Sequence, residues 1–161
     1  MIQNFPIPGS PVEVKLKSLI LYEPKGMAII LLEEPGGTWG LPILAKASEV
    51  ASIARSLRGQ EPIQPLPHDV MNRIIEKANG HLLHVLIDIL EEPLCHGIIA
   101  VEWNGQEVDF DSRPSDAISL ALRAHVPIYV SPAVVSRGAI RLDREDWAAG
   151  LKKHRGLVEE D

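Results

Sequence analysis

The sequence predicts an α+β domain with a mostly antiparallel sheet built from hairpins, together with three or four packed helices. Short runs of alternating apolar side chains are separated by tight-turn signals, of which Asn104-Gly105 is the strongest. Other segments repeat apolar residues at i, i+3, i+4 and i+7, the spacing of a helix that buries one face. Strands and helices do not alternate regularly along the chain, which argues against a parallel α/β sheet.

The first half of the chain predicts three strands followed by two helices. The strands are expected at 12–22, 27–32 and 39–44, separated by turns at 23–26 and 35–37. The helices are expected at 48–57, with Gly59 just past its end, and at 68–78, stopped by Asn79-Gly80. The prolines of 61–67 make that segment an extended connection. The face of the first helix that is expected to be buried consists of Val50, Ile53, Ala54 and Leu57.

The second half predicts a hairpin, a helix and several short elements. Two strands are expected at 83–90 and 95–103, and a third returns from the Asn104-Gly105 turn to end near residue 111. A helix then starts at Pro114. Its buried stripe is expected to consist of Ile118, Ala121, Leu122 and His125. The remaining expected elements are a strand at 128–130, a helical turn capped at Ser131-Pro132 and a charged helix at 143–154.

The expected organisation is a single domain with a segment at either end. Residues 1–11 are expected to be a flexible arm, 12–135 the domain, and 136–161 a C-terminal helical appendage. The N-terminus does not resemble a signal peptide, and no apolar run approaches the roughly 20 residues of a membrane span. The expectation is a cytoplasmic protein with no membrane partner.

Charge and cysteine content exclude several classes of function. The net charge of −6 argues against a general electrostatic grip on nucleic acid, so such contact would need a local basic patch or a bridging cation. The single cysteine, Cys95, excludes an internal disulfide and a cysteine-based zinc cluster. It is expected to be a small buried apolar side chain.

The densest group of polar residues lies where a strand leads into a helix. Val108 and Phe110 alternate with Asp109 and Asp111, which places the two carboxylates on one face of the strand and the apolar pair on the other. Carboxylates in this position can hold a divalent metal ion. They can equally form a solvated strand face.

The helix that follows offers further candidates, each with a structural alternative. Pro114 suits the first turn, which makes Arg113 the expected N-cap and Asp116 the third helical residue. Asp116, assisted by Ser115, can act in a site or can cap the helix. Arg113 can clamp a phosphate through its planar guanidinium group, or it can pair with Asp111 or Glu49.

Histidines supply the remaining candidates. His68 begins a helix and can serve as a general acid or base near neutral pH, although the acidic residue beside it is expected at a helix start in any case. His84 and His96 lie on adjacent expected strands, where they can approach each other as metal ligands or remain ordinary surface side chains. Glu49, at another helix start, is a further candidate.

The segment Asp111-Ser-Arg-Pro-Ser-Asp-Ala-Ile-Ser-Leu-Ala-Leu-Arg123, followed by Pro127-Ile128, resembles the signature of the bifunctional nuclease domain family. Leu41-Pro-Ile43 with the later Glu49, and Pro65-Leu-Pro-His-Asp69, are similar to other family segments, so the resemblance covers about residues 12–135. The chain departs from the family pattern in three places. Pro67 replaces a usual Thr, Leu94-Cys95 replace an aromatic pair, and 44–48 replace a turn that more often contains glycine. The lost aromatics remove surfaces on which bases can stack.

The resemblance implies a nuclease that hydrolyses phosphodiester bonds in DNA and RNA with the help of Mg²⁺ or Mn²⁺. The metal ion would polarise the phosphate and activate water. The expected catalytic residues are Asp109, Asp111, Asp116, His68 and Glu49. The expected phosphate-binding residues are Arg113 and Ser115, and the expected metal ligands are Asp109 and Asp111. The expected partners are single-stranded DNA or RNA and a second copy of the chain. The alternatives are a non-catalytic regulatory or ligand-binding module of the same fold, or a dimeric scaffold.

Overall fold

The computed structural model describes residues 8–22, 26–91 and 94–142, and within them all strands join one sheet. The sheet has eight strands in the order β6-β5-β4-β7-β1-β2-β3-β8. All neighbouring pairs are antiparallel except β4–β7, which confirms the predicted α+β class. The strands are β1 (Val12–Tyr22), β2 (Met27–Glu33), β3 (Trp39–Lys46), β4 (Gly80–Glu91), β5 (Leu94–Trp103), β6 (Gln106–Ser112), β7 (Ile128–Val130) and β8 (Ile140–Arg141).

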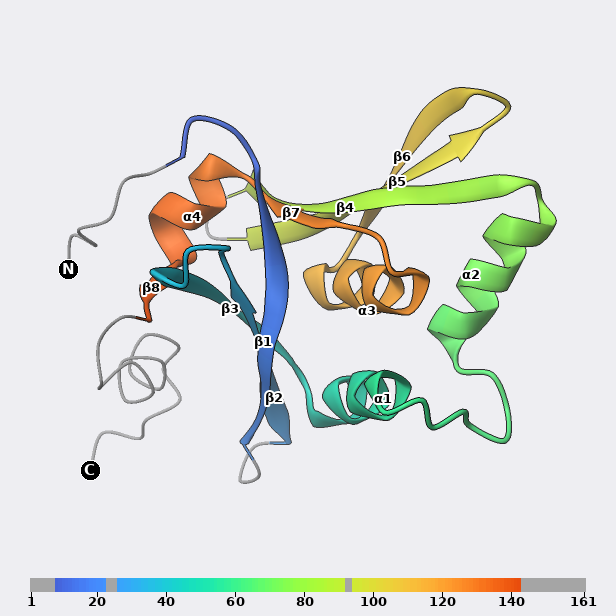
Figure 1. The fold of residues 1–161 in the computed structure, drawn as a ribbon, viewed down its shortest axis with the longest axis horizontal. Coiled ribbons are helices and arrows are strands. Elements are labelled where there is room, and N and C mark those ends of the chain that lie inside the picture. The colour runs from blue at the N-terminus through green and yellow to red at the C-terminus, as the bar shows by residue number, and fades with distance from the viewer. Residues whose placement is uncertain (1–7, 23–25, 92–93, 143–161) are drawn as a thin grey trace.

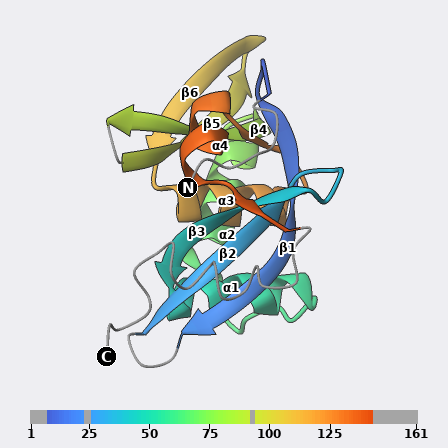
Figure 2. The same cartoon turned by 90° about the vertical axis from the view of Figure 1, so that its left-hand side faces the viewer.

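The sheet consists of two antiparallel halves that meet at β1 and β7. The first residues of β1, Val12 to Val14, pair with β7, and its later residues pair with β2. On its other side β7 pairs with β4 in parallel, with Ile128 opposite Val85. Figure 2 shows β1, β2 and β3 running side by side beneath the β4–β6 half. The sheet therefore bends between its halves and leaves a concave side.

Four helices in the described residues accompany the sheet, and one of them lies inside this curve (Figure 1). They are α1 (Ala47–Leu57), α2 (Pro67–Lys77), α3 (Pro114–Ala124) and α4 (Pro132–Gly138). Helix α3 occupies the concave side, with α1 and α2 packed outside it. Ala117, Ile118, Leu120 and Ala121 of α3 are fully buried. The sequence predicted one buried stripe on this helix, but α3 is buried on several sides. The reason is that strands and other helices both surround it.

Two helix residues expected in the core are not there. His125 is exposed and ends α3 as its C-cap, with a left-handed φ of 56°. It terminates the helix, and so cannot continue the stripe formed by Ile118 and Ala121. Leu57 is 51% exposed, although Val50 and Ile53 of the same helix are buried as predicted. It is the last residue of α1 and lies beyond the strands that cover the start of that helix.

The predicted hairpin is confirmed, but its return strand is an exposed edge. Asn104 and Gly105 both have positive φ, at 52° and 75°, the conformation of a type I′ turn. Strand β6 pairs only with β5 within the described sheet. Val108 and Phe110 are 39% and 42% exposed, so the apolar face of β6 is not buried in the core. The ring of Phe110 contacts Trp103 edge to face.

The helix starts agree closely with expectation, and β8 was not anticipated. Arg113 is the N-cap of α3, and the Ser131 hydroxyl accepts a hydrogen bond from the N–H of Val134 at the start of α4. Strand β8 pairs with β3 and brings the sheet past residue 135. The expected helix at 143–154, the arm at 1–7 and most of the turn at 23–26 lie outside the described residues. No helix in the described ranges is long and apolar enough to cross a membrane.

Candidate functional site

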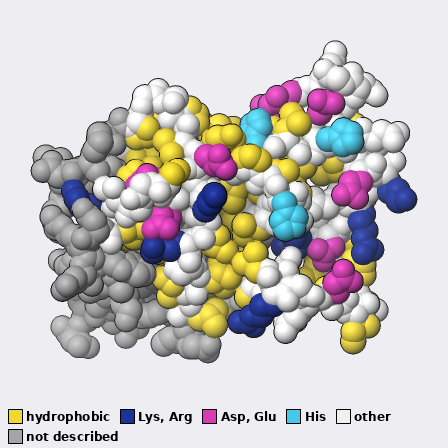
Figure 3. All heavy atoms as spheres, viewed as in Figure 1, with side chains coloured by type: hydrophobic (Ala, Val, Ile, Leu, Met, Phe, Trp, Pro, Cys, Tyr) yellow, Lys and Arg dark blue, Asp and Glu magenta, His cyan; other side chains and the backbone are white. Residues whose placement is uncertain are grey.

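An open cleft of about 590 Å³ lies where β3 and the start of α1 face β5, β6 and the start of α3. Its lining contains four predicted site residues, and they are Glu49, Asp111, Arg113 and Ser115. Lys46 and His96 also line it. On the face shown in Figure 3, Lys and Arg side chains are scattered among Asp, Glu and His and do not form a continuous basic surface. An anion on this face would therefore meet separate cationic groups and not a continuous basic surface.

Arg113 is the centre of a charged cluster at one wall of the cleft. Its Nε donates to Asp116 Oδ2 at 2.7 Å, and its Nη2 donates to Asp116 Oδ1 at 2.9 Å. The same Nη2 lies 2.9 Å from Glu49 Oε1. His68 Nε2 is 3.1 Å from Asp116 Oδ1. Four of the candidate residues, from the starts of α1, α2 and α3, are thus brought together. Their spacing in the sequence does not predict this contact.

This arrangement settles two alternatives left open by the sequence. The carboxylate of Asp116 does not cap α3, because its oxygens are bonded to Arg113 and His68. Hydrogen bonds from Arg113 lower the pKa of Asp116, partial burial opposes this, and the bond to His68 lowers it further. The hydrogen bond and charge of Asp116, followed by the charge of Glu49, raise the pKa of the Arg113 guanidinium. Arg113 pairs with Glu49, as one alternative held, and not with Asp111.

A histidine–aspartate pair forms the other polar wall. His96 Nδ1 lies 3.0 Å from Asp111 Oδ1, with the His96 side chain 15% exposed and that of Asp111 81% exposed. The sequence left open whether His96 approaches His84 on the adjacent strand. The β4–β5 register places His84 opposite Ala100 and His96 opposite Asp88. Four positions along a strand correspond to roughly 13 Å, so the two histidines are not neighbours.

The His96–Asp111 contact could have been predicted from the register of the β5–β6 hairpin. Trp103 pairs with Gln106 across the turn, and counting back along both strands places Ile98 opposite Asp111. His96 is two residues from Ile98 and shares its face of the strand, which makes it a diagonal neighbour of Asp111.

The remaining candidates lie in different surroundings. Asp109 pairs opposite Ala100, further along the exposed hairpin, and does not line the cleft. Ser115 is only 6% exposed. Cys95, expected in the core, is half-buried and lines the cleft. In the described part of the chain, no group of three or more His, Cys, Asp or Glu side chains is placed to hold a metal ion. Asp109 and Asp111 therefore offer at most a pair of carboxylates.

Comparisons with known proteins agree on the family. A family model described as the bifunctional nuclease domain matches residues 29–143. An uncharacterized protein of Mycobacterium tuberculosis is 33% identical over 133 residues, which is 83% of this chain and 79% of that protein. Bifunctional nuclease 2 of Oryza sativa is 28% identical over 117 residues, and bifunctional nuclease 1 of Arabidopsis thaliana is 26% identical over 118. Each plant match covers 71% of this chain but 36% of the plant protein. The chain belongs to the bifunctional nuclease domain family.

Proposed function

We propose that this chain is a nuclease that hydrolyses phosphodiester bonds in DNA and RNA, and that the cleft beside Arg113 is its active site. The observation that carries the proposal is that one cleft is lined by both a histidine–aspartate pair and an arginine with unused donors. Hydrolysis of a phosphodiester needs a group that takes a proton from water and a group that stabilises phosphate charge. Family membership and the plant relatives named as nucleases support the same reading.

His96 is suited to be the general base. Asp111 is placed to accept a hydrogen bond from Nδ1–H, which would fix the tautomer and the orientation of the ring. Nε2 has no partner among the described residues, and it can take a proton from an attacking water. Asp111 then stabilises the imidazolium that forms. In this proposal Asp111 is a positioning residue, and His96 replaces His68 as the base, because His68 is bonded to Asp116.

Arg113 is suited to bind the phosphate. Asp116 and Glu49 engage Nε and Nη2, which leaves both N–H groups of Nη1 without a described partner. The Arg113 side chain is 59% exposed, so a substrate can reach it. The two carboxylates hold the guanidinium group in place, but they also offset its charge. A phosphate therefore needs further positive charge, from Lys46 or from a cation.

A divalent cation fits this requirement. Mg²⁺ is commonly bound by one or two carboxylates together with phosphate oxygens of the substrate, and not by a complete protein cage. Asp111 and Asp109 are the residues that would hold it. When bound, Mg²⁺ or Mn²⁺ supplies a Lewis acid that polarises the phosphate. Of these two carboxylates, Asp111 lines the cleft and Asp109 does not, so the substrate phosphate would supply most of the oxygens that hold the cation.

The test is cleavage of labelled single-stranded DNA and RNA by the purified protein with Mg²⁺, with Mn²⁺ and with EDTA. A His96→Gln variant is expected to lose at least about a hundredfold in rate, the usual contribution of a general base. His84→Gln is the matched control, because His84 lies on the neighbouring strand outside the cleft. Equal rates for wild type and His96→Gln, or activity that separates from the protein on a sizing column, would refute the proposal.

A non-catalytic ligand-binding module is the second candidate, and one observation favours it. Among the described residues, Arg113 is the only arginine that lines the cleft, and it is already paired with Glu49 and Asp116. Together with the His68–Asp116 contact, this geometry also serves purely to lock three helix starts together. This function predicts saturable oligonucleotide binding without cleavage, with Arg113→Lys weakening the binding because lysine lacks the planar fork.

We further propose that the chain forms a homodimer. Strand β6 presents an open edge, and Val108 and Phe110 beside it are partly exposed. Sedimentation equilibrium tests this: a monomer mass at micromolar concentration contradicts it, and Phe110→Lys is expected to weaken the dimer if β6 lies in the interface.

A further inference from the structure

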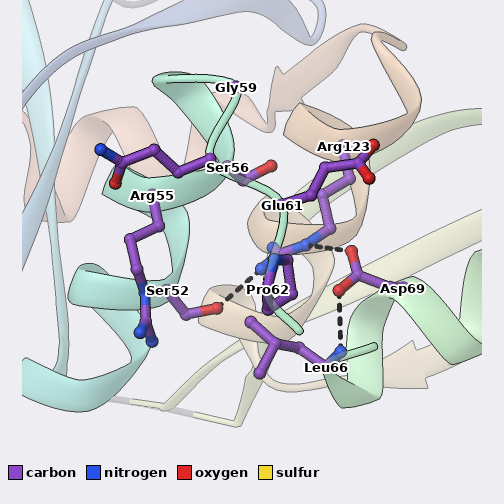
Figure 4. A pocket seen from close by; sticks show the side chains of 10 residues that line it. Ser52, Arg55, Ser56, Gly59, Glu61, Pro62, Leu66, Asp69 and Arg123 are labelled. Atoms are coloured by element: carbon purple, nitrogen blue, oxygen red, sulfur yellow. Dashed lines mark hydrogen bonds and ion pairs between the residues drawn. The ribbon is translucent and has the colours of Figure 1, made fainter. Parts of the chain in front are cut away.

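A second cavity, of about 240 Å³, lies between the end of α1, the start of α2 and Arg123 of α3. It shares no lining residue with the cleft. Its walls are mostly polar, and Figure 4 shows the side chains around it. The polar lining residues are Ser52, Arg55, Ser56, Gln60, Glu61, Asp69 and Arg123. The nuclease proposal uses none of them.

Arg123 is the most informative of these residues because it is almost fully buried. Its side chain is 5% exposed. Nε donates to Asp69 at 3.0 Å, Nη2 to the Ser52 hydroxyl at 2.7 Å, and Nη1 to the carbonyl of Ser119 at 3.1 Å. Asp69 is itself fixed, because its other oxygen accepts from the N–H of Leu66 at 2.8 Å. The guanidinium group is therefore held in one orientation beside the cavity (Figure 4).

That orientation leaves donors unused. A guanidinium group has five N–H bonds, and three of those of Arg123 are committed. The other two have no partner among the described residues. A buried donor without a partner is costly, so an acceptor is expected where these bonds point. The planar fork of arginine matches the oxygens of phosphates and carboxylates better than it matches water.

We propose that this cavity binds a small phosphate-type oxyanion, either inorganic phosphate or the terminal phosphate of a nucleotide or oligonucleotide. Its volume corresponds to about eight water molecules at roughly 30 Å³ each, which accommodates a phosphate group but not an entire nucleotide. Arg55 lies on the exposed rim and adds a second positive charge, and the hydroxyl of Ser56 adds a donor. The charge of Asp69 is matched by Arg123, so the remaining acidic group is Glu61, which is also exposed on the rim.

The charged side chains at the rim predict how each substitution changes the Kd for phosphate. Arg55→Gln is expected to raise the Kd for inorganic phosphate about tenfold or more, the usual worth of one charged hydrogen bond. Glu61→Gln is expected to lower the Kd, because it removes repulsion at the rim. Arg58→Gln is the matched control, since Arg58 is an exposed arginine just beyond α1 that does not line the cavity. All three positions are exposed, so the fold is retained.

The experiment is calorimetric titration of the full chain with inorganic phosphate, with sodium chloride of equal ionic strength as the reference. Parallel titrations with adenosine 5′-monophosphate and adenosine, and with a short oligonucleotide with and without a 5′-phosphate, separate the two sources of the ligand. The expected result is saturable binding that requires the phosphate group and follows the order Glu61→Gln, then wild type and Arg58→Gln, then Arg55→Gln.

Two outcomes of the titrations with wild type, Arg55→Gln and Arg58→Gln overturn the proposal. One is a heat of phosphate addition that matches that of chloride. The other is a phosphate Kd that is the same in Arg55→Gln as in Arg58→Gln. An Arg113→Lys variant separates this proposal from that of the nuclease, because Arg113 is the residue proposed to bind phosphate in the cleft and it does not line the cavity. It is expected to bind phosphate in the cavity as the wild type does, whatever its effect on cleavage. Loss of phosphate binding in Arg113→Lys would place the anion in the cleft and refute the second site.

Discussion

Gly97 of β5 is the position where one added methyl group has the most predictable effect on the candidate site. A Cβ atom at Gly97 would lie 2.6 Å from the Cβ of Ala117, 2.8 Å from the hydroxyl oxygen of Ser112 and 3.0 Å from the carbonyl oxygen of Arg113. Two of these three atoms belong to the start of α3 and cannot rotate away. The Ser112 hydroxyl can rotate, but it then loses its 3.1 Å bond to the carbonyl of Gly97.

The Gly97→Ala variant must therefore move α3 away from β5. Overpacking of this kind typically lowers the free energy of unfolding by about 1–3 kcal/mol. Replacing glycine with alanine also restricts the unfolded chain, which stabilises the folded state by about 0.4–1 kcal/mol. The free energy of unfolding should therefore fall by about 0–2.6 kcal/mol. We expect a value in the upper half of this range, because both contacts that cannot relax are with one helix. At about 2–4 °C per kcal/mol for a chain of this size, the melting temperature should fall by about 3–10 °C.

Thermal unfolding followed by circular dichroism measures this shift. Gly9→Ala is the control, because a Cβ at Gly9 would have nothing within 4 Å and its melting temperature should stay within about 1 °C of the wild type. An unchanged melting temperature for Gly97→Ala would show that α3 can yield without cost. The close strand-to-helix contact would then not be what positions Arg113.

Three further predictions concern local features of the fold. Asp116→Asn should lower the melting temperature at pH 7. Because the folded carboxyl has a depressed pKa, its contribution is complete above the unfolded pKa of about 3.9 and is lost as pH falls through the folded pKa. The difference in melting temperature should therefore shrink as pH is lowered below about 3.9, and a difference that does not change with pH would contradict this. Ser131→Ala removes the acceptor for the N–H of Val134 and should cost about 0.5–1 kcal/mol in urea unfolding, and a smaller change would mean that water replaces the cap. Gly105→Ala should cost about 1–2 kcal/mol because φ is 75°, whereas Asn104→Gly should be nearly neutral; equal costs would argue against the type I′ turn.

Features that depend on neighbouring residues in the chain were predictable from the sequence. The Asn104-Gly105 turn and the N-cap at Arg113 follow from rules that act over a few residues, and the structure has both. Burial was harder to predict, because it depends on which elements pack against a helix or strand. Leu57 and Phe110 have the pattern of core residues but lie where nothing in the described structure fully covers them.

The contacts of the candidate site are likewise of two kinds: one follows from residues close in the chain, and the others depend on how the helices pack. The contact between His96 and Asp111 follows from counting along a hairpin, so the sequence contained it. The cluster of Glu49, His68 and Asp116 does not follow from any spacing. It depends on three helices from different parts of the chain beginning at one place, which only the packing of α1 and α2 around α3 decides.

The place of β7 in the sheet has a consequence for how the chain folds during synthesis. Among the described strands, this strand of three residues alone links the two halves of the sheet. It pairs Val130 with Val12, which lies 130 − 12 = 118 positions earlier. Hairpins such as β2–β3 and β5–β6 can form as soon as they leave the ribosome, because their partners are close in the chain. The halves can join only after residue 130 has emerged. A nascent chain stalled before that point should hold two separate sheets with open edges, the state in which a chain of this topology is most exposed to aggregation.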